Sequence, residues 1–218
     1  SKYARATSKE LSFDKLSYYS KIKGIDLLGT GDFTHPEHFK KISKLKEDRG
    51  VYYHKRFPFI ISGEISLMYN QIKSRKVHLV ILVPSLKVAG EINNFLDTLG
   101  RRDYDGRPIF KIPLPNLVEM LRNIDDKIEI IPAHAWTPWF GVFGSMSGFD
   151  SLKDAFQDQT KHIHAIETGL SCYDEKTEVL TNNGWKKFSK VEYNDKICTL
   201  NLKTAVSYTH LRAHETVL

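Results

Sequence analysis

Residues 127–140, KIEIIPAHAWTPWF, decide the fold that we expect for this chain. The stretch opens with the apolar run Lys127–Ile131, which is typical of a buried strand, and His134 follows where that strand ends. In folds built on parallel strands, and in barrels especially, side chains at the carboxyl ends of the strands carry the chemistry. The stretch therefore predicts a strand that presents a histidine to a site at one edge of a sheet.

Other polar side chains follow further expected strands in the same way. They are Asp32 and His35 after Ile25–Leu28, Glu64 after Phe59–Ser62, and Glu167 after Ile163–Ile166. Acids and histidines at successive strand ends form a pattern that the amphipathicity of helices does not generate. His78 fits this pattern less well, because it lies at the start of its expected strand, Val77–Val83.

Helical patterns alternate with these strands. The expected helices are Leu11–Lys23, Pro36 to about Arg49, Leu86–Leu99, Leu114–Asn123 and Ser151–Gln159. Such alternation favours an α/β fold with a largely parallel sheet. From about Cys172 the chain changes to short apolar segments separated by Asn-Asn-Gly and Tyr-Asn-Asp turns, which are typical of small all-β structure. We therefore expect a domain boundary at Ser171/Cys172.

The basic residues of the chain are unevenly distributed. The 218 residues carry a formal net charge of +6, and most of the excess lies before Cys172. It gathers in Lys40, Lys41, Lys44, Lys46, Arg49, Lys55 and Arg56. Such a cluster suits the phosphate backbone of a nucleic acid, whereas a charge run taken alone is more often a solvated helix face.

The composition also excludes several classes of protein. No apolar run approaches the roughly 20 residues needed to span a bilayer, and the first residues lack the apolar core of a signal peptide. Cys172 and Cys198 make neither a disulfide framework nor the paired spacing of a structural zinc site. We therefore expect a cytoplasmic protein without a membrane segment. Its natural start is expected to be missing, because the sequence opens on Ser1 without a methionine.

Five acids and histidines are candidate metal ligands because each lies beside an expected strand or strand end. They are Asp32, His35, Glu64, His78 and His134. Carboxylates and imidazoles bind zinc and manganese, and such ions hydrolyse phosphodiesters by polarising the phosphate and generating hydroxide. Each residue alone is more often structural, but together they predict a shared metal site. The remaining histidines follow no such pattern, and we expect His38, His54, His162 and His164 to be surface or structural residues without acidic partners.

Three segments carry a resemblance to a known family: GTGDFTHP at Gly29–Pro36, ISGEIS at Ile61–Ser66, and Ile131–Phe140. They resemble the polymerase-and-histidinol-phosphatase (PHP) superfamily and, more narrowly, endonuclease Q. Asp105–Pro108, Ser147–Asp150 and Glu167–Ser171 strengthen the narrower match. The resemblance covers residues 1–171 and implies an incomplete, distorted (β/α)7 PHP-type barrel.

The same resemblance implies an activity. Endonuclease Q enzymes nick DNA on the 5′ side of deaminated bases, such as uracil and hypoxanthine, and of abasic sites. The resemblance implies up to three divalent ions, zinc or manganese with magnesium as a further candidate, and no organic cofactor. DNA that carries such a lesion is the implied partner.

Residue roles also follow from the resemblance. It makes Glu64 a bridging ligand and places His78 and His134 at histidine ligand positions. Asp32 or His35 fills the position after the second strand, and the choice stays open because the usual Asp-His pair is altered here to Asp32-Phe33. A His-x-His motif before Ser1 and an Asp-x-His motif after Ser171 are expected to be cut off. We therefore expect the 218-residue chain to be inactive alone, which measurable metal-dependent nicking by it would contradict.

Aromatic and basic residues near His134 suggest how DNA is held. A repair nuclease must hold a base that has left the stack, and we expect Trp136 or Trp139 to line that pocket. The competing interpretation is that both tryptophans are packing residues. Arg107 and Arg75 are candidate phosphate contacts, with Arg101 and Arg102 as weaker ones.

The segment that begins at Cys172 has a resemblance of its own. Cys172–Phe188 and Asp195–Asn201 resemble the N-terminal splicing block of inteins, which makes residues 172–205 an intein fragment. The resemblance makes Cys172 the nucleophile that attacks the carbonyl of Ser171 and converts an amide into a thioester. An unrelated β-hairpin with a buried Cys172 is the alternative. Residues 206–218 resemble a translated sequencing adaptor, and a genuine β-hairpin of the intein is the alternative there.

Three other functions compete with a lesion-directed DNA endonuclease. The first is a PHP phosphatase of a small phosphorylated metabolite, against which the basic cluster and the tryptophans argue. The second is a non-catalytic PHP domain that binds nucleic acid. The third is self-processing by the intein as the relevant activity.

Overall fold

The computed structural model describes residues 1–5, 7–169, 176–192, 194–199 and 207–210. The chain divides into two compact units, Ser1–Thr168 and Gly169–Leu218, which are treated separately below. The expected nucleophile Cys172 lies outside the described residues.

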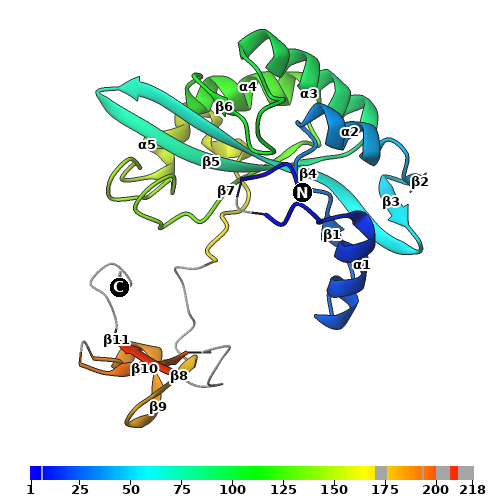
Figure 1. Cartoon of the computed structure of the whole chain (residues 1–218). Helices are drawn as coiled ribbons and strands as arrows, with labels where there is room; N and C mark the ends of the chain where they lie inside the picture. Colours follow the sequence, from blue (N-terminus) through cyan, green and yellow to red (C-terminus); the bar gives the residue numbers. More distant parts are fainter. Residues whose placement is uncertain (6, 170–175, 193, 200–206, 211–218) are drawn as a thin grey trace. The chain divides into compact units, whose positions relative to one another are not determined.

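The first unit is built around one mixed sheet in which a long hairpin is the central element (Figure 1). Its strands are β1 (Leu28–Gly29), β2 (Lys46–Asp48), β3 (Val51–His54), β4 (Phe57–Gln71), β5 (Lys73–Val83), β6 (Ile109–Phe110) and β7 (Glu129–Pro132). The sheet runs in the order β2-β3-β4-β5-β7, and β1 and β6 also pair with β4. Strands β4 and β5 pair continuously from Ile61↔Val83 to Gln71↔Lys73.

The expectation of a largely parallel sheet is wrong. Among the strand pairings of this sheet, those of β1 and β6 with β4 are parallel and the others are antiparallel. An isolated parallel bridge also joins Val77 of β5 to Phe140. The reason is local: Ile72 alone separates β4 from β5, and so short a connection allows only antiparallel strands. No glycine or proline marks this turn, so the sequence pattern divides one long hairpin into two shorter strands.

Six helical segments accompany the sheet. They are α1 (Phe13–Ile22), α2 (Pro36–Ile42), α3 (Leu86–Leu99), α4 (Leu114–Ile124), α5 (Leu152–Phe156) and the 3-10 helix η1 (Gln157–His162). Serine side chains cap α1, α3 and α5, as when Ser85 Oγ accepts a hydrogen bond from the backbone N–H of Val88 at 3.2 Å. Helix α3 has the expected bounds, whereas α2 ends seven residues before Arg49 because Lys46–His54 pairs as β2 and β3. Ile163–Ile166 forms no strand.

The core lies between the sheet and the helices. Odd-numbered side chains of β4, from Phe57 to Tyr69, are all buried, whereas several even-numbered ones are only partly buried, as the period of a strand requires. Helices α3 and α4 cover one face of the sheet (Figure 1). Their buried side chains, which include Ile92, Leu96 and Leu117, belong to one apolar cluster with those of β4 and β5. Packing against these helices therefore holds the long hairpin in place along much of its length.

The described residues of the second unit form mainly β-structure, in line with the expectation. It contains β8 (Glu178–Thr181), β9 (Gly184–Lys187), η2 (Phe188–Lys190), β10 (Lys196–Thr199) and β11 (Ser207–His210). The strands are antiparallel in the order β11-β10-β8-β9. Strand β11 lies in the segment expected to be adaptor-derived, and its pairing with β10 agrees with the alternative of a β-hairpin.

No helix in the part of the chain that the structure describes combines the length and the apolar character that crossing a bilayer would need.

Candidate metal centre

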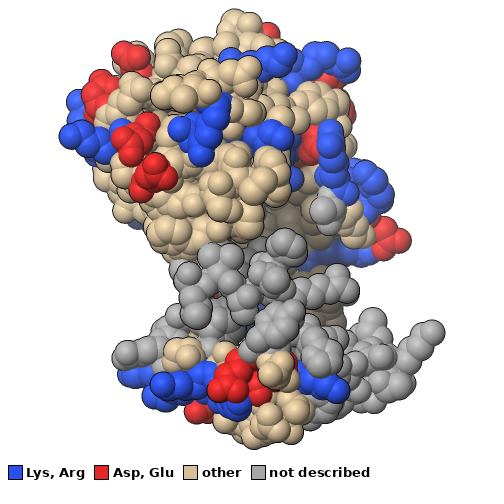
Figure 2. Space-filling model, turned by 90° about the vertical axis from the view of Figure 1, so that its left-hand side faces the viewer, with Lys and Arg blue, Asp and Glu red and all other residues tan. Residues whose placement is uncertain are grey.

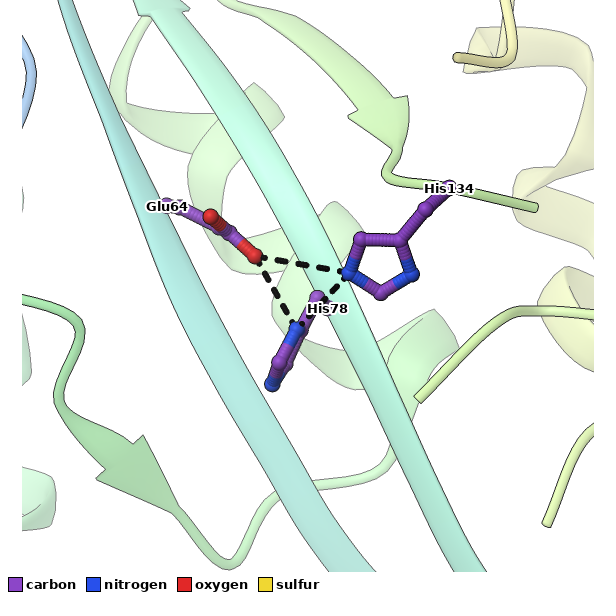
Figure 3. A group of neighbouring side chains, drawn as sticks. All are labelled: Glu64, His78 and His134. Atoms are coloured by element: carbon purple, nitrogen blue, oxygen red, sulfur yellow. Dashed lines mark hydrogen bonds and ion pairs between the residues drawn. The ribbon is translucent and has the colours of Figure 1, made fainter. Parts of the chain in front are cut away.

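Glu64, His78 and His134 converge on one point (Figure 3). Glu64 Oε1 lies 3.0 Å from His78 Nδ1 and 3.7 Å from His134 Nε2, and the two histidine nitrogens are 3.0 Å apart. These three are the candidate ligands that the structure brings together, out of the five that the sequence suggested.

Strand register explains the convergence. Ser66 pairs with His78, so Glu64, two residues away on β4, faces the same side of the sheet as His78. Leu79 pairs with Pro132, which places His134, two residues beyond β7's last residue, beside His78. Only His134 follows the end of a strand, since Glu64 and His78 lie well inside β4 and β5. The site therefore lies on a face of the sheet and not, as expected, beyond the ends of parallel strands.

The three donors fit a divalent ion. Zinc binds histidine nitrogen and carboxylate oxygen at about 2.0–2.2 Å, so neighbouring donors of a tetrahedral site lie about 3.3 Å apart. The observed separations of 3.0, 3.0 and 3.7 Å bracket that value. Two histidines and one glutamate, with a fourth position left open, is a donor set of catalytic zinc.

Hydrogen bonds orient His134 for this role. Its Nδ1 lies 2.7 Å from Thr137 Oγ1, and that hydroxyl also lies 3.0 Å from the carbonyl oxygens of His134 and Trp139. The hydroxyl has one proton, which it donates to a carbonyl, so it accepts from a protonated Nδ1. The other nitrogen, Nε2, then keeps a free lone pair that points toward Glu64 and His78.

Glu167 holds the backbone of His134. His134 has a φ of +33°, a left-handed conformation that is uncommon for residues other than glycine. Its backbone N–H donates to the Glu167 carboxylate, and the backbone N–H of Ala135 donates to the Glu167 carbonyl at 2.8 Å. Residue Phe140 supports the second histidine, because its ring stacks on His78 at 4.1 Å between centroids.

Charges around the site favour an ionised carboxylate. Burial raises the pKa of Glu64, but polar contacts with His134 and His78 and the nearby positive charge of Arg107 outweigh it and hold that pKa well below its usual range. Arg107 Nη1 lies 3.0 Å from Glu64 Oε1 and 3.4 Å from His78 Nδ1. Burial lowers the pKa of His78 more than the Glu64 carboxylate raises it, which favours the neutral imidazole that a metal needs.

Asp32 and His35 do not join the Glu64–His78–His134 group. Asp32 is 7% exposed and its carboxylate contacts the amino group of Ser1. His35 is buried and stacks on the ring of Tyr3 at 4.1 Å. Its Nδ1 is buried and has no hydrogen-bond partner among the described residues.

The candidate DNA-contacting residues differ in what they touch. Trp136 stacks on Phe143, whereas Trp139 is half exposed and has Lys76 Nζ 4.8 Å above its ring. Arg107 reaches the metal ligands, as described above. Arg75 instead lies over the Phe149 ring at 3.9 Å and donates to the carbonyl of Gly148, so its guanidinium is engaged in packing.

Sequence reasoning missed the partners of several histidines. Thr137, three residues after His134, is a local signal that could have been found. Two histidines expected to lack acidic partners have them: His54 pairs with Asp14 and His164 with Glu129, each at 2.9 Å. These partners are 40 and 35 residues away in the sequence, so no local pattern reveals them.

Comparison with known proteins finds one similar curated protein sequence and two similar solved structures among its matches. An uncharacterized protein of Methanocaldococcus jannaschii is 31% identical over 139 residues, which is 63% of this chain and 16% of the relative. The crystal structure of a lesion-specific endonuclease from Pyrococcus furiosus, PfuEndoQ, matches with a TM-score of 0.68 and 30% identity. A structure of endonuclease Q with a 27-mer duplex carrying an abasic lesion at the active site matches with a TM-score of 0.69 and 31% identity.

Both structural matches cover 79% of this chain. The chain spans 41% of each solved structure and 16% of the curated relative. No family model matches the sequence.

Proposed function

We propose that this chain is part of a metal-dependent, cytoplasmic DNA endonuclease that hydrolyses a phosphodiester at a deaminated base or an abasic site. The observation that carries the proposal is the convergence of Glu64, His78 and His134 within 4.8 Å. This convergence occurs in a chain that is similar, with TM-scores of 0.68 and 0.69, to endonuclease Q structures.

Each residue near the site has a role in this proposal. Glu64, His78 and His134 hold a zinc or manganese ion, which supplies Lewis-acid polarisation of a phosphate and a water of lowered pKa. Arg107, next to Glu64 and partly exposed, binds a non-bridging phosphate oxygen of the strand to be cut. Thr137 and Glu167 keep His134 in the orientation that binding requires.

Asp32 or His35 contributes to a further ion in the intact enzyme. The buried Nδ1 of His35, which has no hydrogen-bond partner among the described residues, supports His35 in particular. An imidazole nitrogen in that situation gains a partner when it binds a metal.

Aromatic and basic side chains supply the contacts to DNA. Trp139 is 49% exposed, so its ring is available for stacking on a base that has left the duplex. Trp136 is similarly exposed at 39%. Lys and Arg side chains also lie along several margins of the first unit's surface (Figure 2). Such charges attract the phosphate backbone without reading its sequence.

Lesion-selective, metal-dependent DNA binding tests the proposal. We expect the 218-residue chain to bind a fluorescein-labelled duplex with one abasic analogue more tightly than the undamaged duplex, as measured by fluorescence anisotropy. Zn²⁺ or Mn²⁺ should strengthen this binding, and EDTA should remove the preference. Trp139→Ala should weaken lesion binding by about 5-fold or more, because one stacked base contributes about 1–3 kcal/mol. Trp185→Ala, at an exposed tryptophan of the second unit, is the matched control.

Other results of these experiments would support a different function for the chain. Equal binding of damaged and undamaged duplexes with or without metal would favour a non-catalytic nucleic-acid-binding domain. Hydrolysis of a small phosphate monoester by the full-length gene product, without nicking of abasic DNA, would favour a phosphatase. Unchanged lesion binding after Trp139→Ala would remove the stacking role of that residue.

We also propose that an intein begins at Cys172 and that residues 172–205 belong to it. The antiparallel sheet formed by the described residues of the second unit supports this proposal. The proposed step is attack of the Cys172 thiol on the Ser171 carbonyl, which replaces the peptide bond by a thioester and leaves the amino group of Cys172 free. Expression of the full gene should yield a ligated product, and Cys172→Ala should abolish it. A ligated product from the Cys172→Ala gene would refute the proposal.

A further inference from the structure

We propose that the tip of the β4–β5 hairpin is a second DNA-contacting element, in which Ile72 inserts as an apolar wedge between base pairs. This inference rests on the proposed DNA endonuclease function. It adds a contact that is remote from the metal centre and sets the length of duplex that the protein engages.

The first observation is the exposure of Ile72. Its side chain is fully exposed, at 106% of the reference value, on the turn between β4 and β5. Other exposed apolar side chains of the first unit keep part of their surface covered, as Ile22 does at 63%. Full exposure of a large aliphatic side chain gives the folded chain no burial, so it offers an apolar surface to something else.

The second observation is the backbone of the same residue. Ile72 has a φ of +60°, a left-handed conformation that is unfavourable for a β-branched residue. Hairpin turns that need this conformation usually contain glycine, asparagine or aspartate. An isoleucine here is therefore costly for the fold as well as for solubility. A strained residue at an exposed tip points to a function at that position.

The third observation is the charge of the hairpin end. Residues 68–76, MYNQIKSRK, contain three cationic side chains and no aspartate or glutamate. Lys73 and Asn70 are exposed, and Gln71 is partly exposed. Proteins that bend DNA from the minor groove combine Lys, Arg, Asn or Gln with an inserted Ile, Leu, Phe, Met or Pro. The tip of this hairpin has that composition.

Carboxylates limit the direction from which DNA can approach. A groove of about 860 Å³ at the tip is lined by Gln71, Ile72, Arg75 and Lys153 but also by Asp150, Asp154 and Asp158. Phosphates would be repelled from that side, where Arg75 is already engaged with Phe149. Arg75 and His78 point to opposite faces of β5, so a duplex that avoids these carboxylates meets the tip from the face that carries Glu64 and His78.

Geometry connects the tip to the metal centre. The strands that form the tip also carry Glu64 and His78, and they pair without interruption between the two places. At about 3.3 Å per residue, the eight residues from Glu64 to Ile72 span about 26 Å. This length matches about eight base pairs at 3.4 Å each. Lys76, which faces the same side as His78 and lies over Trp139, is placed between the two ends of this path.

A duplex with fluorescent bases tests the wedge. The 218-residue chain is mixed with abasic duplexes that carry 2-aminopurine at one step, moved from about five to about eleven base pairs on either side of the lesion. We expect fluorescence to rise at one step near eight base pairs on one side, because insertion unstacks that base. Ile72→Asn should abolish the rise and weaken binding about 5- to 30-fold. Ile22→Asn, at an exposed isoleucine of α1, should change neither.

Two further measurements separate the wedge from misfolding and from the proposed function. Ile72→Asn should leave the thermal unfolding temperature unchanged or raise it, since asparagine tolerates the left-handed conformation. A duplex shortened to about four base pairs on the contacted side should bind Ile72→Asn and the parent chain equally.

If the parent chain binds lesion DNA but shows no unstacked step and no effect of Ile72→Asn, the wedge is refuted while the proposed function stands. If it binds no lesion DNA at all, the proposed function fails. A change in self-association without any effect on DNA would refute the wedge in favour of a protein contact.

Discussion

Replacing Glu64 with glutamine lowers the affinity of the chain for Zn²⁺ by about 100-fold or more. The carboxylate is the one anionic donor among the three convergent side chains, and a neutral amide is a poor ligand for a divalent ion. The substitution keeps the size of the side chain, so the two histidines are not expected to move far. Competition with a chromophoric chelator at neutral pH measures the change.

A stability measurement checks the same prediction independently. Ligand that binds only the folded chain at 100 times its dissociation constant stabilises it by about 2.7 kcal/mol. Zn²⁺ should therefore raise the unfolding temperature of the parent chain and have little effect on Glu64→Gln. Glu119→Gln, at an exposed glutamate of α4, is the matched control and should respond to Zn²⁺ as the parent chain does. Equal Zn²⁺ affinity in the parent chain and Glu64→Gln would show that the metal binds elsewhere.

Local patterns predicted the helices better than the sheet. Helix α3 begins after the Ser85 cap and ends at Leu99, before Gly100. The capping serine and the terminating glycine both directly flank the helix, so the local sequence reveals its bounds. The long hairpin has no such signal, because Ile72 stands where a turn residue is expected. The sequence pattern therefore could not show that β4 and β5 are one antiparallel unit.

The candidate site likewise combines features that the sequence pattern revealed with features that it did not reveal. Glu64, His78 and His134 were found as acids and histidines beside expected strands, but the reason given was incomplete, since two of them lie inside strands of a hairpin. Apart from Thr137, which is local to His134, key contacts that orient and charge the site are long-range. Arg107 is 43 residues from Glu64, and Glu167 is 33 residues from His134. Such pairs depend on how the chain folds back on itself, which spacing in one sequence does not reveal.

The loop after His134 links the metal centre to the stability of the fold, and Gly144→Ala should damage both. A β-carbon at Gly144 would lie 3.0 Å or less from the carbonyl oxygens of Thr137, Pro138 and Gly141. These are backbone atoms, and the loop is held by its own hydrogen bonds, such as Met146 N–H to the Pro138 carbonyl at 3.1 Å. The loop cannot make room without losing such bonds, so we expect a loss of about 3–4 kcal/mol in the free energy of unfolding.

Metal binding should fall along with stability, because Thr137 both borders Gly144 and orients His134. Displacement of a residue that orients a ligand typically reduces metal affinity about 10- to 100-fold. Urea unfolding and Zn²⁺ competition on the same samples measure the two effects. Gly90→Ala is the control: apart from its chain neighbours and the backbone of its own helix, no atom of the described residues lies within 4 Å of the added β-carbon. Alanine inside α3 should stabilise the chain by about 0.5–1 kcal/mol. If Gly144→Ala unfolds at the same urea concentration as the parent chain, the loop is not the rigid support of His134 that its packed carbonyls indicate.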